Sequence, residues 1–289
     1  MAILVTGGTG KTGRPIVQLL HKGGHSVYVA SRSGKAPQPH TGVQFDWADS
    51  ATFEAPFAAA SAANETITAV YLVCPNLPDH SAIAKIVNSF IDLAITKGVK
   101  RFVLMSASAI VKGGPGTAGQ GFVHEHLDKI GADYVSLRPT YFMDNFVESF
   151  PNVTVKTQNV VLSAAQDARI PFVSAEDISK AAVEALTAEK IAHKDLLIGG
   201  PDFLTFDDIA ATLSEVLGRS IVHKKNTQQQ QEADLIKLGV PEGVAKFLSA
   251  MDAAFTTGEE EKRFQAGNTW TGSQTFKAFV EAHREAWDA

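Results

Sequence analysis

The chain begins with the stretch Ile3-Leu4-Val5-Thr6-Gly7-Gly8-Thr9-Gly10-Lys11-Thr12-Gly13, an apolar run that leads into a glycine-rich turn. A continuous apolar run such as residues 3–5 is typical of a strand that is buried on both faces. From Gly13 onward the apolar residues follow helical spacing, and Pro15 stands in the first turn, where proline is favoured. A strand, a glycine turn and a helix in this order predict a site for nucleotide phosphates. The start of a helix attracts anions, and glycines let a pyrophosphate approach the backbone.

Two kinds of phosphate site share features of this stretch. The triplet Gly10-Lys11-Thr12 matches the end of a P-loop, but that motif requires a glycine where Val5 stands. We therefore exclude a P-loop. The glycines at positions 7, 10 and 13, followed by a second predicted strand at residues 25–30, favour a dinucleotide-binding turn.

The residues that follow the second predicted strand distinguish NADP(H) from NAD(H). An acidic residue at this point holds the ribose 2′-hydroxyl of NAD, whereas a 2′-phosphate requires cationic and hydroxyl donors. The chain has Ser31-Arg32-Ser33 here, with Lys35 close behind. The sequence therefore predicts NADP(H) as cofactor, with Arg32 and Ser33 at the phosphate. The alternative for Arg32 is an ordinary solvated arginine.

Length, composition and charge exclude several classes of protein. The chain has 289 residues, of which 45% are hydrophobic and 20% charged, with a net charge of −5 and no basic cluster. These values are ordinary for a globular protein and argue against nucleic-acid and membrane partners. Its single cysteine cannot form an internal disulfide. With no apparent signal segment or membrane span, we expect a cytoplasmic protein with a small-molecule substrate. The oligomeric state, monomer or homodimer, stays open.

Strand-like and helix-like segments alternate through the first half of the chain. Further apolar runs follow at residues 43–45, 69–73, 101–105 and 134–137, and residues 79–97 fit a helix that ends at Gly98. The fold class predicted is α/β: a Rossmann-type, doubly wound parallel sheet with a smaller C-terminal α/β substrate lobe. We place a dinucleotide-binding domain at residues 1–146 and the lobe at residues 147–289. Within the lobe we expect helices that begin at Ser174, at Thr205 and at Pro241, and an exposed helix start or loop at residues 228–231.

Several strings of residues carry a resemblance to a known family. They are Leu4-Val5-Thr6-Gly7-Gly8, Lys11-Thr12-Gly13, Phe45-Asp46-Trp47, Val70-Tyr71-Leu72-Val73, Arg101-Phe102-Val103-Leu104, Ser106-Ala107-Ser108, His126-Leu127-Asp128, Leu137-Arg138-Pro139-Thr140, Phe142-Met143-Asp144-Asn145, residues 170–178 and Val216-Leu217-Gly218-Arg219. With these strings the chain resembles the NmrA-like branch of the atypical short-chain dehydrogenases, and within it the fungal ergot-alkaloid reductases, the festuclavine and agroclavine dehydrogenases. The resemblance spans nearly the whole chain.

The resemblance implies positions for the parts of the coenzyme. The pyrophosphate would lie on Gly7, Gly10, Lys11, Thr12 and Gly13, the ribose phosphate on Arg32, and the adenine beside Asp46 and Trp47. The nicotinamide and its ribose would be surrounded by Cys74, Pro75, Asn76, Ser106, Ala107, Ser108, Pro139, Thr140, Tyr141 and Phe142. The same branch includes quinone reductases and redox-sensing regulators that bind coenzyme without turnover, so these functions stay as alternatives.

The sequence lacks the usual acid–base pair of ketone-reducing short-chain dehydrogenases, a tyrosine followed by a lysine four residues later. Tyr134 is followed at that distance by Arg138, and Tyr141 by Asn145. A protonated imine needs no proton donor, because hydride addition to it requires only proximity and orientation. We therefore expect an NADPH-dependent reductase of an iminium or conjugated C=C bond, with a quinone or enone as the alternative substrate.

Three residues are the catalytic candidates. His124 is a candidate proton donor, since the pKa of an imidazole lies near neutrality. Asp144 or Glu125 could steady a cationic substrate, although either could equally be a surface carboxylate or a helix cap. Tyr141 adjoins the nicotinamide according to the resemblance. No metal site is expected, because His124 and His126 lie two apart on a predicted helix and no acidic or cysteine cluster accompanies them. A substrate wall is expected from Tyr141, Phe142, Met143, Phe146, Phe172, Phe247, Met251 and Phe255.

Overall fold

The computed structural model describes residues 1–77, 79–113 and 118–288, and the chain forms two compact units. The first unit comprises Met1–Pro139 and Ile178–Leu197, and the second comprises Thr140–Asp177 and Ile198–Ala289. The chain thus leaves the first unit at Pro139 and returns to it for one further segment. The division into functional domains at residue 146 stays a prediction.

A sheet of eight strands contains six strands of the first unit, one strand that runs from the first unit into the second, and one strand of the second unit. The strands are β1 (Ala2–Thr6), β2 (Ser26–Ser31), β3 (Thr41–Gln44), β4 (Ile67–Val73), β5 (Arg101–Met105), β6 (Asp133–Pro139), β8 (Asp195–Gly199) and β10 (Thr269–Thr271), in the order β10-β8-β6-β5-β4-β1-β2-β3. The pairs from β3 to β6 are parallel. From β1 the chain builds outward first to one side and then to the other, which confirms the doubly wound Rossmann-type sheet. The last strand, β10, belongs to the second unit. Directly after it, Gly272 donates its N–H to the carbonyl of Gly199, the last residue of β8, at 2.8 Å.

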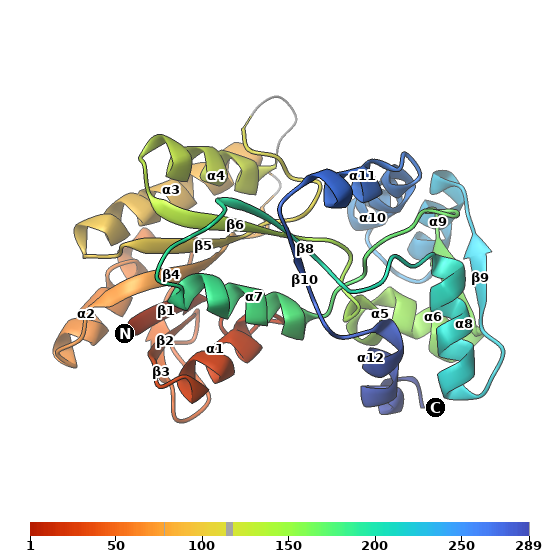
Figure 1. Ribbon diagram of the computed structural model, residues 1–289, viewed down its shortest axis with the longest axis horizontal. Coiled ribbons are helices and arrows are strands. Elements are labelled where there is room, and N and C mark those ends of the chain that lie inside the picture. Colours follow the sequence, from red (N-terminus) through yellow and green to blue (C-terminus); the bar gives the residue numbers. More distant parts are fainter. Residues whose placement is uncertain (78, 114–117, 289) are drawn as a thin grey trace. The chain divides into compact units, whose positions relative to one another are not determined.

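Helices cover both faces of the sheet in the first unit. They are α1 (Gly13–Lys22), α2 (Ala55–Ala62), α3 (His80–Thr96), α4 (Gly119–Lys129) and α7 (Ala175–Thr187), with a short 3-10 helix at Ser50–Thr52. Figure 1 shows α3 and α4 on one face and α1 and α7 on the other. The predicted helix at residues 79–97 is confirmed: the carboxylate of Asp79 accepts the N–H groups of Ser81 and Ala82, and Gly98 follows with a φ of 98°. The core under α3 and α4 includes Leu4, Val70, Leu72, Val87, Phe90, Phe102, Leu104, Val123 and Leu127.

The second unit contains mostly helices and one small sheet. Its elements are α5 (Asn145–Glu148), α6 (Phe150–Gln158), β7 (Val160–Ser163), α8 (Phe206–Leu217), β9 (Val222–Lys225), α9 (Gln228–Lys237), α10 (Glu242–Phe255), α11 (Glu259–Ala266), α12 (Phe276–Ala282) and a 3-10 helix at Arg284–Trp287. Strands β7 and β9 pair in parallel. The predicted helix starts are confirmed, since Ser174 accepts the N–H of Asp177, Thr205 forms a capping box with Asp208, and α10 begins directly after Pro241.

Aromatic side chains make up much of the core of the second unit. Phe146 and Phe172 are fully buried and pack with each other and with Phe206 and Phe276. Phe247 is 66% exposed on α10. The expectation that Phe146 and Phe172 line a substrate site is therefore wrong, because both rings are buried in the core; a substrate contact of the exposed Phe247 stays a prediction.

The helices in the described part of the chain are too short or too polar to cross a membrane.

Candidate functional site

The glycine turn between β1 and α1 has the conformation that its sequence predicts. Gly7 has a φ of 64°, which side chains disfavour, and its carbonyl accepts the N–H of Gly10 at 2.9 Å. At Gly13, the first residue of α1, an added Cβ would lie 2.1 Å from the carbonyl oxygen of Gly7. Turn and helix therefore pack so closely that only glycine fits. This is the backbone cradle that a pyrophosphate requires, although its occupation by a coenzyme stays a prediction.

A buried hydrogen-bond network fixes the start of α1 from behind. The hydroxyl groups of Thr12 and Tyr71 lie 2.9 Å apart, and both residues are buried. The hydroxyl of Ser179, on α7, donates to the carbonyl of Thr12 at 2.9 Å. Thr12 thus directs its side chain into the core, so any contact with a phosphate would come from its backbone, while Lys11 is exposed. The sequence shows Tyr71 only as part of the apolar run at residues 69–73, in which its hydroxyl is the single hint of this role.

Arg32 lies in a turn directly after β2. The turn is closed by the N–H of Gly34, which donates to the carbonyl of Ser31 at 3.1 Å. The hydroxyl of Ser33 accepts the N–H of Lys35 at 3.3 Å. Arg32 is exposed and makes no hydrogen bond or ion pair with any residue that the structure describes. Its guanidinium is therefore available for an anionic ligand at the carboxyl end of the sheet.

Trp47 and Asp46 form a turn beside the end of β4. The indole N–H of Trp47 donates to the carbonyl of Val73 at 3.1 Å, and its ring packs edge-on against Phe45 with 4.7 Å between centroids. The carboxylate of Asp46 accepts the N–H of Ala48 at 3.0 Å. The half-buried Trp47 is therefore fixed against the carboxyl end of β4, as a residue beside an adenine would have to be.

Cys74, Pro75 and Asn76 follow β4 immediately. Cys74 and Pro75 are half-buried, and Asn76 is exposed. Burial raises the pKa of the Cys74 thiol to about 12. Burial therefore favours the protonated thiol at neutral pH.

The segment after β5, residues 106–108, is tied to β6. Ser106 and Ser108 donate their N–H groups to the carbonyls of Leu137 and Pro139 at 2.8 and 2.9 Å. Arg138 donates from its guanidinium to the carbonyls of Ala107, at 3.4 Å, and of Ser108. The sequence prediction missed Arg138, which stands only in one of the matched strings. An arginine in a strand that is buried from Tyr134 to Pro139 is the signal that could have found it.

His124 lies on α4 in the first unit. It is 4% exposed, and its ring packs edge-on against Tyr134 at 5.4 Å. Burial lowers the pKa of His124, so the imidazole is mostly neutral at pH 7. Tyr134 is the second residue of β6 and lies near the amino end of this strand. Ligands of such sheets bind at the carboxyl ends of the strands. The role of His124 as proton donor stays a prediction.

Tyr141 and Asp144 belong to the second unit and are described within it. Tyr141 packs against Phe172 and Phe206 at 5.3 and 5.6 Å between ring centroids. Burial, and then the charge of Asp252, raise the pKa of Tyr141 well above its usual value. The carboxylate of Asp144 accepts the N–H of Ala175, the first residue of α7, at 2.7 Å. This is the capping contact that the sequence left open, and a role of Asp144 toward a substrate stays a prediction.

The remaining predicted contacts of the nicotinamide are distributed over both units. Pro139 is the last residue of β6 in the first unit. In the second unit, the buried hydroxyl of Thr140 donates to the carboxylate of Glu260 at 2.8 Å. The side chain of Phe142 is half-buried, and its backbone forms an isolated parallel β-bridge with Val173.

One phenol and one ammonium group lie close together at the amino end of β6. The Nζ atom of Lys194 lies 4.9 Å from the centre of the Tyr134 ring, and it also contacts the carboxylate of Asp128 at 3.2 Å. Burial and the nearby Asp128 raise the pKa of Tyr134. This pair therefore does not reproduce the acid–base couple of ketone-reducing enzymes, in which a lysine lowers the pKa of the phenol.

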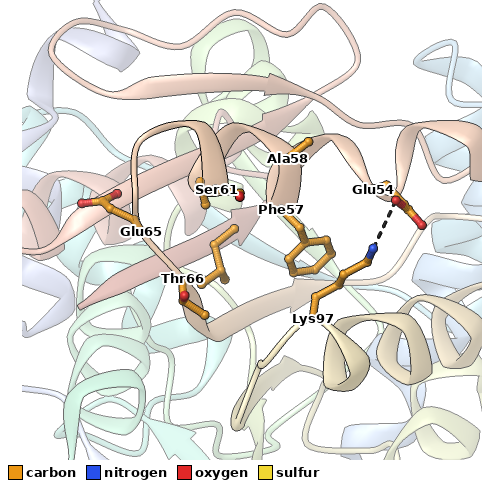
Figure 2. Close-up of a pocket in the computed structure, with 9 residues that line it drawn as sticks. Glu54, Phe57, Ala58, Ser61, Glu65, Thr66 and Lys97 are labelled. Carbon is orange, nitrogen blue, oxygen red and sulfur yellow. Dashed lines mark hydrogen bonds and ion pairs between the residues drawn. The ribbon is translucent and has the colours of Figure 1, made fainter.

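A pocket of about 390 Å³ lies at the start of β4, away from the glycine turn. Figure 2 shows its lining residues, which come from α2 and the preceding Glu54, from residues 65–67 at the entry to β4, and from Lys97 directly after α3. Lys97 and Glu54 form an ion pair of 3.2 Å. This pocket shares no residue with the predicted coenzyme site. Within the described ranges, no three His, Cys, Asp or Glu side chains gather as a metal site would require.

Known proteins match this sequence over nearly its full length. The sequence profile of the NmrA-like family matches residues 1–280. The chain is 40% identical over 295 residues to agroclavine dehydrogenase of Claviceps fusiformis, with 99% of each protein covered. It is 38% identical over 293 residues to festuclavine synthase II of Penicillium roqueforti, with 99% of this chain and 100% of that protein covered. Triphenylmethane reductase of Citrobacter sp., solved with NADP(H), shares the fold with a TM-score of 0.80 at 20% identity, over 98% of this chain and 100% of that one.

Proposed function

Since the chain belongs to the NmrA-like family, we propose that it is an NADPH-dependent reductase of a bulky, largely apolar secondary metabolite. Its electrophile is an iminium or a conjugated C=C bond. The observation that carries the proposal is the glycine turn, where Gly13 packs so closely on Gly7 that an added Cβ would lie 2.1 Å from the Gly7 carbonyl oxygen. The relatives named agroclavine dehydrogenase and festuclavine synthase support the reaction class.

The residues at the carboxyl ends of the strands fit a dinucleotide phosphate. Gly7, Gly10, Lys11, Thr12 and Gly13 would bind the pyrophosphate through backbone N–H groups and one ammonium group. Arg32 and Ser33 would bind the 2′-phosphate, because a guanidinium and a hydroxyl both donate to phosphate oxygens. The adenine would lie beside Asp46 and Trp47. The nicotinamide end would lie among Cys74, Pro75, Asn76, Ser106, Ala107, Ser108, Pro139, Thr140 and Phe142.

The chemistry assigned to the chain's own residues is orientation and charge stabilisation. Bound NADPH would supply the hydride. An iminium carbon accepts it without a proton, so the neutral state of His124 and the high pKa of Tyr141 are no obstacle. Asp144 would stabilise the positive charge of the substrate. For a conjugated C=C bond a proton donor is required, and His124 and Tyr141 are the candidates.

The test is oxidation of NADPH by the purified chain, followed at 340 nm with a panel of cyclic iminium ions, enones and quinones. We expect turnover with iminium or enone substrates and a strong preference for NADPH over NADH. Turnover with quinones alone would replace this proposal with a quinone reductase. Binding of NADPH without turnover of any member would instead support a redox-sensing regulator.

A further inference from the structure

Arg138 connects three separate segments at the carboxyl end of β6. We propose that it is a positioning residue, which holds residues 106–108 against the nicotinamide end of the coenzyme. The inference rests on the proposed function and deepens it, because it separates the two ends of the coenzyme site. The side chain of Arg138 acts through the backbone of another segment.

The hydrogen bonds of Arg138 show how the segment is held. Residues 106–108 follow the last residue of β5, where the regular ladder ends. Backbone bonds from Ser106 and Ser108 to β6 fix one side of the segment. The guanidinium of Arg138 donates hydrogen bonds to the carbonyls of Ala107 and Ser108. N–H and carbonyl groups of the segment are thus both bound to β6, which leaves its conformation little freedom.

Asp195 supplies the charge that a buried guanidinium requires. Its Oδ2 atom accepts from Nη1 of Arg138 at 2.8 Å, and Arg138 is only 7% exposed. The Oδ1 atom of Asp195 is buried and has no hydrogen-bond partner among the described residues. The carboxylate of Asp195 thus neutralises the charge of Arg138. Removing either side chain would leave the charge of the other one unpaired. A lysine could not replace the arginine, because one ammonium group lacks the planar fork that reaches three acceptors.

The location of these contacts distinguishes positioning from general stability. Every acceptor of Arg138 given above is a protein atom, so the guanidinium is not assigned to the coenzyme itself. The segment that it holds belongs to the predicted nicotinamide contacts. The pyrophosphate is assigned to the turn after β1, and the 2′-phosphate of the adenosine is assigned to the turn after β2. Disturbing Arg138 should therefore weaken one end of the coenzyme site and spare the other.

A second arginine of the same sheet provides a matched control. Arg101 pairs with Asp133 at 2.8 Å and donates to the carbonyls of Ala185 and Ala188. It therefore has the same kinds of partner as Arg138, but it begins β5 at the amino end of the sheet. Arg101→Lys should destabilise the fold without a specific effect on coenzyme.

The experiment measures dissociation constants by calorimetry for NADPH and for 2′-phospho-ADP-ribose, which lacks the nicotinamide. We expect Arg138→Lys to weaken NADPH binding by about tenfold and to lower kcat, while the fragment binds within about twofold of the unaltered chain. Arg101→Lys should leave both constants unchanged. Asp195→Asn, which keeps the size of the side chain, should reproduce the effect of Arg138→Lys if that variant fails to fold.

Three results would overturn the inference: equal weakening of NADPH and fragment, no change in either, or the same pattern in Arg101→Lys. Failure of the unaltered chain to bind both ligands would overturn the proposed function itself, and the inference with it. The two failures are thus distinguishable by the behaviour of the unaltered chain.

Discussion

The first unit leaves polar groups available at the carboxyl ends of its strands, whereas the second unit uses its polar groups to hold its own fold. Arg32 is exposed and makes no interaction with the described residues, and the glycine turn presents its backbone. In the second unit, Asp144 caps a helix, Thr140 donates to Glu260, and Tyr141 is buried among aromatic rings. A coenzyme site can therefore be inferred from geometry in the first unit. The chemistry assigned to the second unit requires groups that already have structural partners.

The largest effect is expected at Gly13. Gly13→Ala would place a methyl group 2.1 Å from the carbonyl of Gly7, so the turn must distort. We expect NADPH binding to weaken by about a hundredfold or more, because misplaced N–H groups no longer meet the pyrophosphate. Calorimetry and thermal unfolding would check this. The control is Gly243→Ala in the second unit, where the new Cβ meets nothing within 4 Å; binding there should be unchanged. Undiminished binding in Gly13→Ala would remove the turn from the account.

The choice of coenzyme should depend on Arg32. Arg32→Ala removes a charge-assisted contact to the 2′-phosphate, so we expect the preference for NADPH over NADH, measured as the ratio of kcat/KM, to fall by about a hundredfold. Lys22→Ala removes an exposed cation at the other end of α1 and serves as control. An unaltered preference in Arg32→Ala would assign the phosphate to other residues.

How far the fold can be predicted from sequence differs between the units. The central strands β1, β4 and β5 are buried on both faces, so they appear as apolar runs, and Asp79 and Gly98 mark the ends of α3. The amide of Gln231 was expected at an exposed helix start or loop. It is instead fully buried between the N–H of Ala164 and the carboxylate of Asp252. Its partners come from remote positions, and local pattern carries no record of such contacts. Arg138 stands out in sequence as a charged residue within an apolar strand, but its acceptors on Ala107, Ser108 and Asp195 likewise come from other segments.

The buried Asp252 makes the stability of the second unit depend on pH. Burial raises the pKa of Asp252 to about 7, above the value of 3.8 expected in the unfolded chain. The folded state therefore binds the proton more tightly, and the stability that this proton provides is lost as pH rises through 7. The loss begins above pH 3.8, and between pH 5 and 8 we expect it to amount to about 3 kcal/mol in the free energy of unfolding.

Asp252→Asn tests this assignment, because the amide keeps an acceptor for Gln231 and cannot ionise. Urea unfolding at several pH values should show a flatter profile in this variant than in the unaltered chain. Identical profiles would show that Asp252 does not ionise in this range.

Asp144, in the second unit, has both a structural contact and a proposed role in catalysis, so a substitution there can separate the two. Asp144→Asn keeps an acceptor for the N–H of Ala175 and removes the charge. If the carboxylate stabilises a cationic substrate, kcat/KM for an iminium should fall by about tenfold, with unchanged NADPH affinity. Steady-state kinetics with iminium and enone substrates would measure this. A rate that does not change leaves Asp144 as a helix cap alone.

The smallest effect is expected at His124. His124→Gln should change kcat for an iminium by less than about twofold, because that reaction needs no proton donor. The pH profile with an enone gives the complementary measurement. A large loss of rate with the iminium would contradict the proposed chemistry.

The most direct test of the account is a crystal structure of the chain grown with NADPH. We expect a pyrophosphate against the glycine turn at the start of α1, with the 2′-phosphate on Arg32 and the nicotinamide beside residues 106–108. A coenzyme bound elsewhere, or a glycine turn that stays empty at saturating NADPH, would contradict it.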